Sequence, residues 1–288
     1  MGVLIQNPKS RIQNPRPRPL IIGHRGASGD APENTIAAFD LAMEQHADGI
    51  EFDVRLSKDG VPVVIHDATL WRTTSARGRV RGRTLAELKQ LDAGSWFNRL
   101  FPHLADPRYD GQQIPTLAET LAWVRFRRCL AYLEIKGGRL TCPGIEELVL
   151  AEIHRAQVLS LVTVISFHQP SLRRVRSLDP QIAVGVDLTQ PLAAVRLARS
   201  IGARTVLPSG RFARPVFIAR AQRAGLAVVV WGVDREDAMR RRIAAGVDGI
   251  ITGYPGRLGE VLRGPSSVVR SRILPGASAT DRQSPTAD

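Results

Sequence analysis

Short runs of β-branched and other apolar residues alternate with longer stretches of helical periodicity through most of this chain. The alternation begins with IIGH, PENTIAAFDLAMEQ and GIEFDV, and it ends with GVDGIIT. Once VPVVIHD is treated as an extra piece, there are eight strand candidates, each followed by a helix candidate, in about 240 residues. This order predicts an α/β fold, a (β/α)8 TIM barrel, with a doubly wound open sheet as the alternative.

Two tails and one insertion interrupt this pattern. Residues 1–19 contain four prolines and four basic side chains, and residues 265–288 are rich in Ser, Pro, Ala and Thr. We expect both tails to be disordered, which leaves residues 20–264 for the barrel. The stretch from about 68 to 114 breaks the rhythm of strands and helices. It is predicted to be a small irregular insertion after the second strand, near the barrel mouth.

The composition is typical of a globular protein with one substantial core, since 43% of the 288 residues are hydrophobic. Cys129 and Cys142 have neither disulfide-framework nor metal-site spacing, so both are expected to be free thiols in a reducing compartment. No segment has the length and apolar character of a signal peptide or a transmembrane helix. A cytoplasmic protein is therefore predicted, and its oligomeric state is left open.

The formal net charge of +13 raises the question of a nucleic-acid partner. However, the clustered arginines within 125–128, 173–176 and 240–242 fall in helix-like stretches without interleaved aromatic residues. Such clusters are typical of solvated helix faces, so no nucleic-acid partner is predicted. A positive surface would still attract anionic substrates, or bring the protein into peripheral contact with an anionic membrane.

Two pairs of charged residues lie late in two predicted strands. Residues i and i+2 of a strand share a face, so Glu51 projects with Asp53 in GIEFDV, as Glu134 does with Lys136 in YLEIK. Their late positions place all four at the C-terminal mouth of a barrel. Three carboxylates that converge there would repel one another without a cation, and oxygen ligands suit Mg2+ or Ca2+ better than zinc. The alternative is a polar layer of ion pairs.

Two histidines also end predicted strands. His24 ends IIGH and His66 ends VVIH, and beside three carboxylates they are interpreted as an acid and base pair, because histidine titrates near neutrality. Arg25 offers a planar set of donors for a phosphate. Trp231 ends VVVW and is either an apolar wall over the site or part of the core. Glu33 in APENT is given a purely structural role in the first turn of a helix.

With these residues in view, the chain resembles the glycerophosphodiester phosphodiesterase family. The matching elements run in order from about residue 20 to 262: GHRGAS, PENTIAAF, DGIEFDVRLSKDGVPVVIHD, the RTT of LWRTT, LDAGSWF, IPTLAE, LEIK, SFH, VVVWGVD and GVDGIIT. The resemblance implies a barrel enzyme that uses a divalent cation to hydrolyse glycerophosphodiesters to sn-glycerol 3-phosphate and an alcohol. It assigns catalysis to His24 and His66, the metal to Glu51, Asp53 and Glu134, and the phosphate to Arg25 and Lys136.

The chain departs from the family pattern at two places. Gly253 stands where members often have Asp, and Gly232, Val233 and Asp234 stand where they have Thr-Val-Asn, which puts substrate choice in question. Two other functions stay open: a lysophospholipase D-type cleavage of lysophospholipids, and a non-catalytic barrel that binds polyanions. The sequence also does not decide whether water or a neighbouring hydroxyl of the glycerol moiety attacks the phosphorus, or which histidine is the acid.

Overall fold

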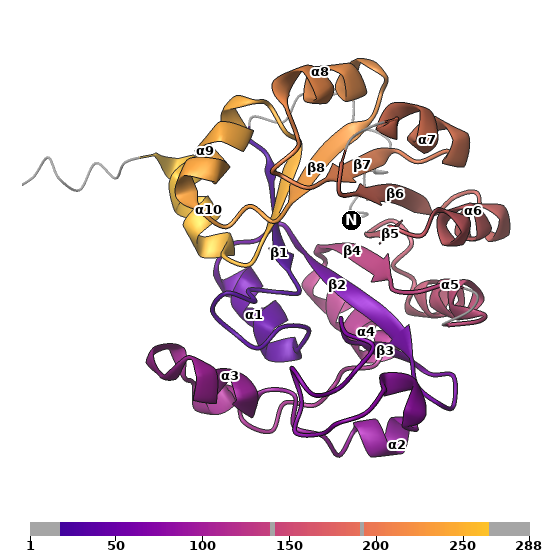
Figure 1. Ribbon diagram of the computed structural model, residues 1–288, viewed down its shortest axis with the longest axis vertical. Helices are drawn as coiled ribbons and strands as arrows, with labels where there is room; N and C mark the ends of the chain where they lie inside the picture. Colours follow the sequence, from indigo (N-terminus) through magenta and orange to yellow (C-terminus); the bar gives the residue numbers. More distant parts are fainter. Residues whose placement is uncertain (1–17, 139–141, 191–192, 265–288) are drawn as a thin grey trace, which may run out of the picture.

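Eight parallel strands and the helices that follow them make up most of the computed structural model, which describes residues 18–138, 142–190 and 193–264 (Figure 1). The parallel strands are β1 (Leu20–His24), β2 (Gly49–Leu56), β4 (Leu130–Ile135), β5 (Val162–Ser166), β6 (Ala183–Leu188), β7 (Thr205–Pro208), β8 (Ala227–Trp231) and β9 (Gly249–Thr252). The main helices are α1 (Ile36–Glu44), α4 (Leu117–Arg127), α5 (Ile145–Ala156), α6 (Gln169–Leu178), α7 (Ala194–Ile201), α8 (Pro215–Arg223), α9 (Glu236–Ala244) and α10 (Pro255–Arg263).

The sheet closes on itself. The strands pair in parallel in the order β1, β2, β4, β5, β6, β7, β8, β9, and β9 pairs back with β1. Closure leaves no open edge in the parallel sheet, and the helices lie around its outside (Figure 1). The prediction of a (β/α)8 barrel is therefore confirmed, and the alternative of an open doubly wound sheet is wrong.

Alternation along the strands separates two apolar layers. In β2, Ile50, Phe52 and Val54 are fully buried in the large cluster between the strands and the surrounding helices. A second cluster draws its buried members from the strands alone, so it fills the barrel interior. These members are Ile22, Tyr132, Ile165, Leu207, Val229 and Ile251. Each fully buried Ile, Leu or Phe contributes roughly 1.5–3 kcal/mol to folding, so the two layers hold the strand ends firmly in place.

The extra piece VPVVIHD forms a short strand outside the parallel set. This strand, β3 (Pro62–Val64), pairs antiparallel with the end of β2, and Val64 lies opposite Val54. Because β3 ends at Val64, His66 lies two residues beyond the strand, and the prediction that it is the last strand residue is wrong. A 2.7 Å hydrogen bond from Arg55 Nε to the His66 carbonyl oxygen holds this turn against β2.

The insertion after β3 consists of short helices and loops. Its helices are α2 (Leu85–Leu88), α3 (Ser95–Leu100) and the 3-10 helices η2 (Val80–Gly82), η3 (Pro102–Leu104) and η4 (Pro107–Tyr109). It has a small core of its own, in which Leu70, Leu88 and Ile114 are buried. The prediction of a small insertion after the second barrel strand is confirmed.

Most of both predicted tails lies outside the described residues, so their disorder stays a prediction. Arg18 is described and forms an ion pair of 2.8 Å with Asp48. Cys129 and Cys142 are buried free thiols. In the parts of the chain that the structure describes, no helix is both long and apolar enough to cross a bilayer. The reducing compartment and the cytoplasmic location stay predictions.

Candidate active site

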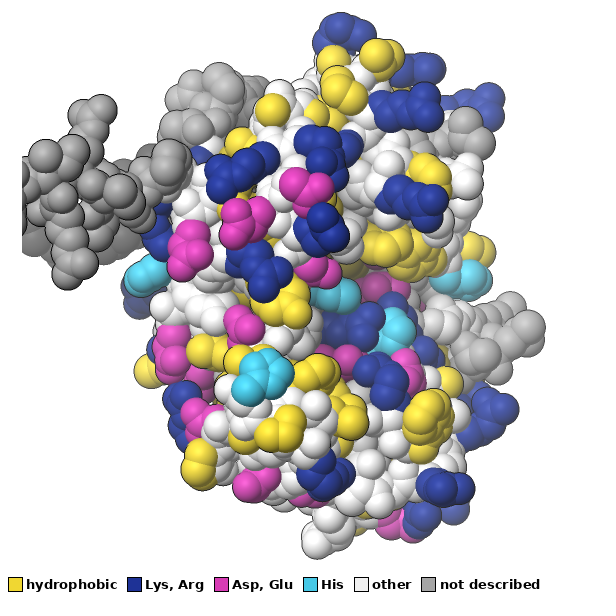
Figure 2. Space-filling view, turned by 60° about the vertical axis from the view of Figure 1, so that its left-hand side comes forward, with side chains coloured by type: hydrophobic (Ala, Val, Ile, Leu, Met, Phe, Trp, Pro, Cys, Tyr) yellow, Lys and Arg dark blue, Asp and Glu magenta, His cyan; other side chains and the backbone are white. Residues whose placement is uncertain are grey.

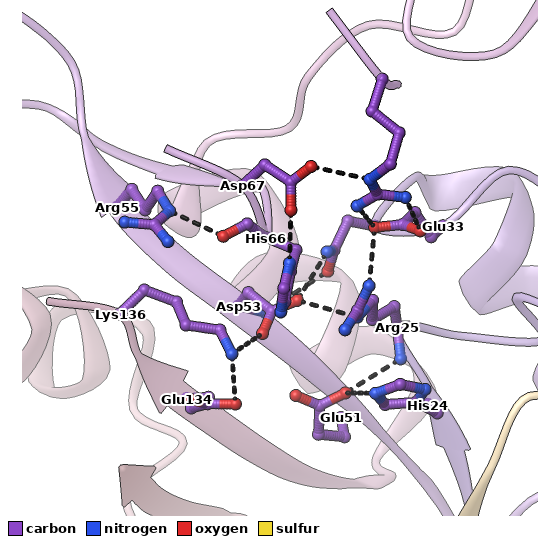
Figure 3. A network of polar contacts seen from close by, with 12 residues as sticks. His24, Arg25, Glu33, Glu51, Asp53, Arg55, His66, Asp67, Glu134 and Lys136 are labelled. Atoms are coloured by element: carbon purple, nitrogen blue, oxygen red, sulfur yellow. Dashed lines mark hydrogen bonds and ion pairs between the residues drawn. The ribbon is translucent and has the colours of Figure 1, made fainter. Parts of the chain in front are cut away.

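Neighbouring strands bring the predicted site residues together at one end of the barrel. β2 lies between β1 and β4, and the register places Glu51 beside His24 and Asp53 beside Glu134. Because the strands are parallel, their C-terminal ends share one rim, and His66 follows β3 at the same end. Figure 3 shows these side chains gathered around one centre, and Figure 2 shows a hollow where histidine, basic and acidic side chains meet.

Three carboxylates form the centre of this group. Glu51, Asp53 and Glu134 each offer one oxygen, and these oxygens lie within 4.8 Å of one another. Their exposed fractions are 3%, 1% and 7% respectively, so water screens them little. Burial, and then the charge of Asp53, raise the pKa of Glu51 well above its usual range and that of Glu134 to about 7. Two of the three carboxylates are therefore poorly stabilised in their charged form.

Two protein cations balance part of this negative charge. Lys136 Nζ lies 2.8 Å from Glu134 Oε2 and 3.1 Å from Asp53 Oδ1, while Arg25 Nε lies 3.3 Å from Asp53 Oδ2. Burial alone would raise the pKa of Asp53, but Lys136 and Arg25 hold it well below its usual value. Asp53 thus fits the alternative that these charged residues form a polar layer of ion pairs. Glu51 does not fit this alternative, because it has no Lys or Arg side chain in ion-pair contact within the described residues.

This donor set fits a hard divalent cation. Carboxylate oxygens are the preferred protein ligands of Mg2+ and Ca2+, and a buried cluster whose charge is not fully balanced gains from binding one. The raised pKa values of Glu51 and Glu134 indicate that this gain is available here. Glu51, Asp53 and Glu134 are the residues that would hold the ion.

In chelator-treated protein, Glu134 is expected to contribute on the order of 3 kcal/mol less to the free energy of unfolding at about pH 8 than at about pH 5. Glu134 releases its proton at its ordinary value of 4.5 when unfolded, but at about 7 when folded. Between these values Glu134 binds more protons in the folded state, so its contribution to stability falls as the pH rises. The lowered pKa of His24 acts in the opposite direction, so the effect is measured as the difference between the wild type and Glu134→Gln. Urea unfolding followed by circular dichroism measures the effect.

Two controls accompany this measurement. Glu134→Gln should lack the contribution of Glu134 to the pH dependence, because this titrating group is gone. Excess Mg2+ or Ca2+ at about pH 8 should restore the stability of the wild type, because the ion favours the charged carboxylates. The same pH dependence in the wild type and in Glu134→Gln in chelator would contradict the assignment.

The two histidines flank the carboxylates. His24 Nε2 lies 3.9 Å from Glu51 Oε2, and burial together with Arg25 lowers the pKa of His24 to about 4. Burial also lowers the pKa of His66, so both rings are mainly neutral near pH 7. His66 Nδ1 lies 2.7 Å from Asp67 Oδ1. A neutral ring that donates from Nδ1 to this carboxylate keeps its lone pair on Nε2.

The turn after β1 has an unusual backbone. Arg25 has a φ of 53°, in the left-handed region that only a few non-glycine residues adopt, and Gly26 follows with a φ of 83°. A Cβ at Gly26 would lie 2.6 Å from backbone atoms of Ala38, so only glycine fits there. The turn directs the Arg25 backbone amide to Glu51 at 3.0 Å and its guanidinium to Glu33 at 2.9 Å. Conformations of this kind cluster at functional sites.

Glu33 belongs to the site, and the interpretation that it serves only the first turn of a helix is wrong. Helix α1 begins at Ile36 with Thr35 as its N-cap, so Glu33 lies before the helix. Its two oxygens accept hydrogen bonds from Arg25 and, at 2.6 and 2.7 Å, from Arg72 of the insertion. The helix starts one turn later than the sequence suggested, because Thr35 rather than a residue before Pro32 caps it.

Arg72 connects the insertion to Arg25 and to His66. Besides Glu33, it donates from Nε to Asp67 Oδ2 at 2.7 Å, and Asp67 in turn contacts His66 (Figure 3). A continuous chain of polar contacts therefore runs from Arg25 through Glu33, Arg72 and Asp67 to His66. Arg72 lies in the RTT element and Asp67 directly follows His66, but the sequence does not show that one side chain reaches the other.

Two other buried polar residues near the site were not predicted. Asn34 Nδ2 donates to Asp53 Oδ2 at 2.8 Å, and its Oδ1 accepts from the Asp53 amide. Asp187 on β6 is 4% exposed, and its Oδ2 has no hydrogen-bond partner in the described part of the chain. Burial, and then the charge of Glu134, raise the pKa of Asp187 well above its usual range. The signal in the sequence was an acid directly after QIAVGV.

Trp231 lies at the end of β8, across the barrel from β4. Its indole donates to the Leu207 carbonyl oxygen at 2.9 Å, and its ring meets Phe167 edge to face, with centroids 5.8 Å apart. Phe167 is 45% exposed, so the pair forms an apolar part of the rim. The role of Trp231 in substrate binding stays a prediction.

Asp234, which stands where family members have Asn, has a structural role. Its Oδ1 accepts hydrogen bonds from Thr252 Oγ1 at 2.8 Å and from the Gly253 amide at 3.0 Å. A Cβ at Gly253 would approach Ser28 Oγ to 3.1 Å, so the turn after β9 packs closely against the turn after β1. These contacts hold the turns after the first and last barrel strands, β1 and β9, against each other beside the site.

Comparisons with known proteins show which family the chain is similar to. Residues 24–257 match the model of the glycerophosphoryl diester phosphodiesterase family. A glycerophosphodiester phosphodiesterase from Caldanaerobacter subterraneus subsp. tengcongensis is 40% identical over 85% of this chain and 98% of its own. One from Bacillus subtilis is 36% identical over 86% of this chain and 87% of its own. A solved Oleispira antarctica phosphodiesterase, in complex with the product sn-glycerol-3-phosphate, has a TM-score of 0.76 at 30% identity, covering 86% of this chain and 98% of that one.

Proposed function

The chain belongs to the glycerophosphoryl diester phosphodiesterase family, and from this premise we propose its substrates, its cation and its mechanism. It hydrolyses glycerophosphodiesters to sn-glycerol 3-phosphate and an alcohol, with one divalent cation, Mg2+ or Ca2+. The main support for this proposal is the buried cluster of Glu51, Asp53 and Glu134. These carboxylates could bind a divalent cation, and the cation would attract the negatively charged phosphodiester. The product bound to the Oleispira antarctica enzyme supports the same product here.

The phosphate is held next to the carboxylate cluster. When bound there, the cation would supply positive charge against the phosphate oxygens. Arg25 and Lys136, which already contact Asp53, lie on two sides of the cluster and donate hydrogen bonds to those oxygens. In this arrangement the protein's own cations orient the phosphodiester, and the mostly buried setting strengthens each contact.

His24 and His66 move the protons. Asp67 stabilises the positive charge that His66 gains when its Nε2 binds a proton, so His66 in this protonated form is assigned as the acid that protonates the leaving alkoxide. His24 is assigned as the base that accepts the proton of the attacking oxygen. This oxygen belongs to water or to a neighbouring hydroxyl of the glycerol moiety, and the second route passes through a cyclic phosphate.

One assay tests the function directly. Purified protein is expected to release glycerol 3-phosphate from glycerophosphocholine and glycerophosphoethanolamine, to lose this activity in chelator, and to regain it with Mg2+ or Ca2+. Release of phosphocholine instead of choline, or full activity in chelator, would contradict the proposal.

A second substrate class is favoured by the exposed apolar part of the rim. Phe167 and Trp231 form one apolar pair, and Trp71 in the insertion is 66% exposed. An acyl chain would find contacts there, as lysophospholipase D-type cleavage requires. Comparing kcat/KM for glycerophosphocholine and lysophosphatidylcholine decides between the classes. The polyanion-binding alternative is not retained, because the chain belongs to a family of enzymes.

Arg72→Ala is expected to lower kcat/KM by about tenfold to a hundredfold, as is usual for residues that orient catalytic groups. Without Arg72, Glu33 and Asp67 lose a partner each, so Arg25 and His66 are held less firmly. Arg83→Ala is the matched control, because Arg83 lies in the same insertion but makes only an exposed ion pair with Glu87. Equal kcat/KM values for the two variants would show that Arg72 does not position the site.

A further inference from the structure

One segment of the chain carries positive charge alone. Residues 188–233 contain seven arginines and no lysine, aspartate or glutamate. This segment alone therefore supplies +7 of the net charge of +13 of the whole chain. The segment covers α7, β7, α8 and β8. Several exposed arginines elsewhere form ion pairs, as Arg174 does with Glu147 and Arg240 with Glu236. None of the seven has a carboxylate partner among the described residues.

Four exposed arginines define what we call the arginine face: Arg196, Arg211 and Arg214 near the mouth, and Arg220 in the last turn of α8. Arg211 and Arg214 lie in the loop between the C-terminal end of β7 and the start of α8, which belongs to the mouth end of the barrel. Arg196 lies in the first turn of α7. Together with Phe217, Arg196 and Arg220 line a hollow of about 320 Å3 between α7 and α8.

Apolar surface lies among these charges. Val216, in the first turn of α8, is 79% exposed, and Phe217 beside it is half-buried at the hollow. Figure 2 shows dark blue and yellow side chains covering the upper end of the molecule, where α8 lies in Figure 1, while magenta side chains begin further down. The face is therefore basic and apolar at once.

We propose that the arginine face docks the protein on the surface of an anionic phospholipid bilayer. Arginines without carboxylate partners complement lipid phosphates, and Val216 enters the boundary between headgroups and acyl chains. A nucleic-acid backbone would satisfy the arginines but leave Val216 in water. The segment also offers little exposed aromatic surface for stacking bases, since Phe212 and Phe217 are half-buried.

Docking in this way has a consequence for the site. The β7–α8 loop and the carboxylate cluster lie at the same end of the barrel, because both follow the C-terminal ends of parallel strands. The mouth is then held close to the lipid surface. This docking does not depend on the proposed reaction, so a catalytically inactive His24→Ala variant should bind vesicles like the wild type.

Sedimentation of the full-length protein with vesicles tests the proposal. The wild type should bind vesicles made of equal parts phosphatidylcholine and phosphatidylglycerol, and bind phosphatidylcholine vesicles far less. A triple variant, Arg196→Gln with Arg214→Gln and Arg220→Gln, should bind the anionic vesicles about a hundredfold more weakly. Val216→Asp, which removes no arginine, should also weaken binding. Circular dichroism confirms that each variant is folded.

A second triple variant is the matched control. Arg125→Gln with Arg155→Gln and Arg240→Gln removes the same charge from exposed positions on α4, α5 and α9, and should leave vesicle binding within about threefold of the wild type. Equal losses in the two triple variants would overturn the proposal, since net charge alone would then explain binding. Absence of binding to the anionic vesicles, or tighter arginine-dependent binding to duplex DNA, would also overturn it.

Discussion

Alanine in place of His66 or of His24 is expected to lower kcat by at least about a hundredfold, because each ring transfers a proton in the reaction. His24 Nε2 lies 3.9 Å from Glu51 Oε2 of the carboxylate cluster, and the ring of His66 is held by its 2.7 Å contact with Asp67. Glycerophosphocholine hydrolysis with saturating cation measures the effect. The fold should survive both changes, since each side chain is partly exposed at the mouth.

The p-nitrophenyl ester of glycerol 3-phosphate separates the two proton-transfer roles. Nitrophenolate leaves without being protonated, so His66→Ala should recover most of its activity on this substrate if His66 is the acid. His24→Ala should not recover, because the attacking oxygen still has to lose a proton. His103→Ala, which removes an exposed histidine from the insertion, is the control and should have normal rates on both substrates. Near-normal glycerophosphocholine hydrolysis by His24→Ala or His66→Ala would remove that histidine from its role.

Asp53→Asn is expected to lower activity by at least about a thousandfold, because the cation's contribution to charge stabilisation amounts to several kcal/mol. Asp53 contacts Lys136 and Arg25 and lies within 4.8 Å of the other two carboxylate oxygens of the cluster. The amide keeps the shape of the side chain but removes its charge. Isothermal titration calorimetry with Mg2+ and Ca2+ should show weaker ion binding, independently of any activity measurement.

Asp187→Asn is the matched control for Asp53→Asn. Asp187 is also a buried acid at the end of a barrel strand, but it does not belong to the cluster of three carboxylates. Its raised pKa favours the neutral carboxyl, which an amide resembles, so ion binding and turnover should stay close to normal. If the two variants behaved alike, the cluster would not be the ion site.

Most of the barrel and the centre of the site could be predicted because they depend on local pattern. Alternating residues in a strand fix which side chains share a face, so Glu51 and Asp53 had to point the same way. Parallel strands then place His24, Asp53 and Glu134 at a common rim without any further information. The chemistry of three buried carboxylates restricted the partner to a cation.

The supporting contacts could not be predicted, because they depend on how distant segments pack. Glu33 was taken for a helix residue, and only the path of the insertion brings Arg72 to it. Asn34 reaches Asp53 from a backbone with a φ of 57°, which no sequence pattern announced. The end of β3 was misplaced by two residues. Ile65 is apolar and buried, so the sequence pattern extends the strand to His66, whereas the last paired residue is Val64.

The proposed reacting groups all come from one side of the barrel, on β1, β2, β4 and the turn after β3. Phe167 and Trp231 lie elsewhere, after β5 and at the end of β8. The proposed reacting groups and this apolar part of the rim thus lie in separate stretches of the sequence. Substitutions in the loops after β5 and β8 would therefore alter the apolar rim and leave the proposed reacting groups in place.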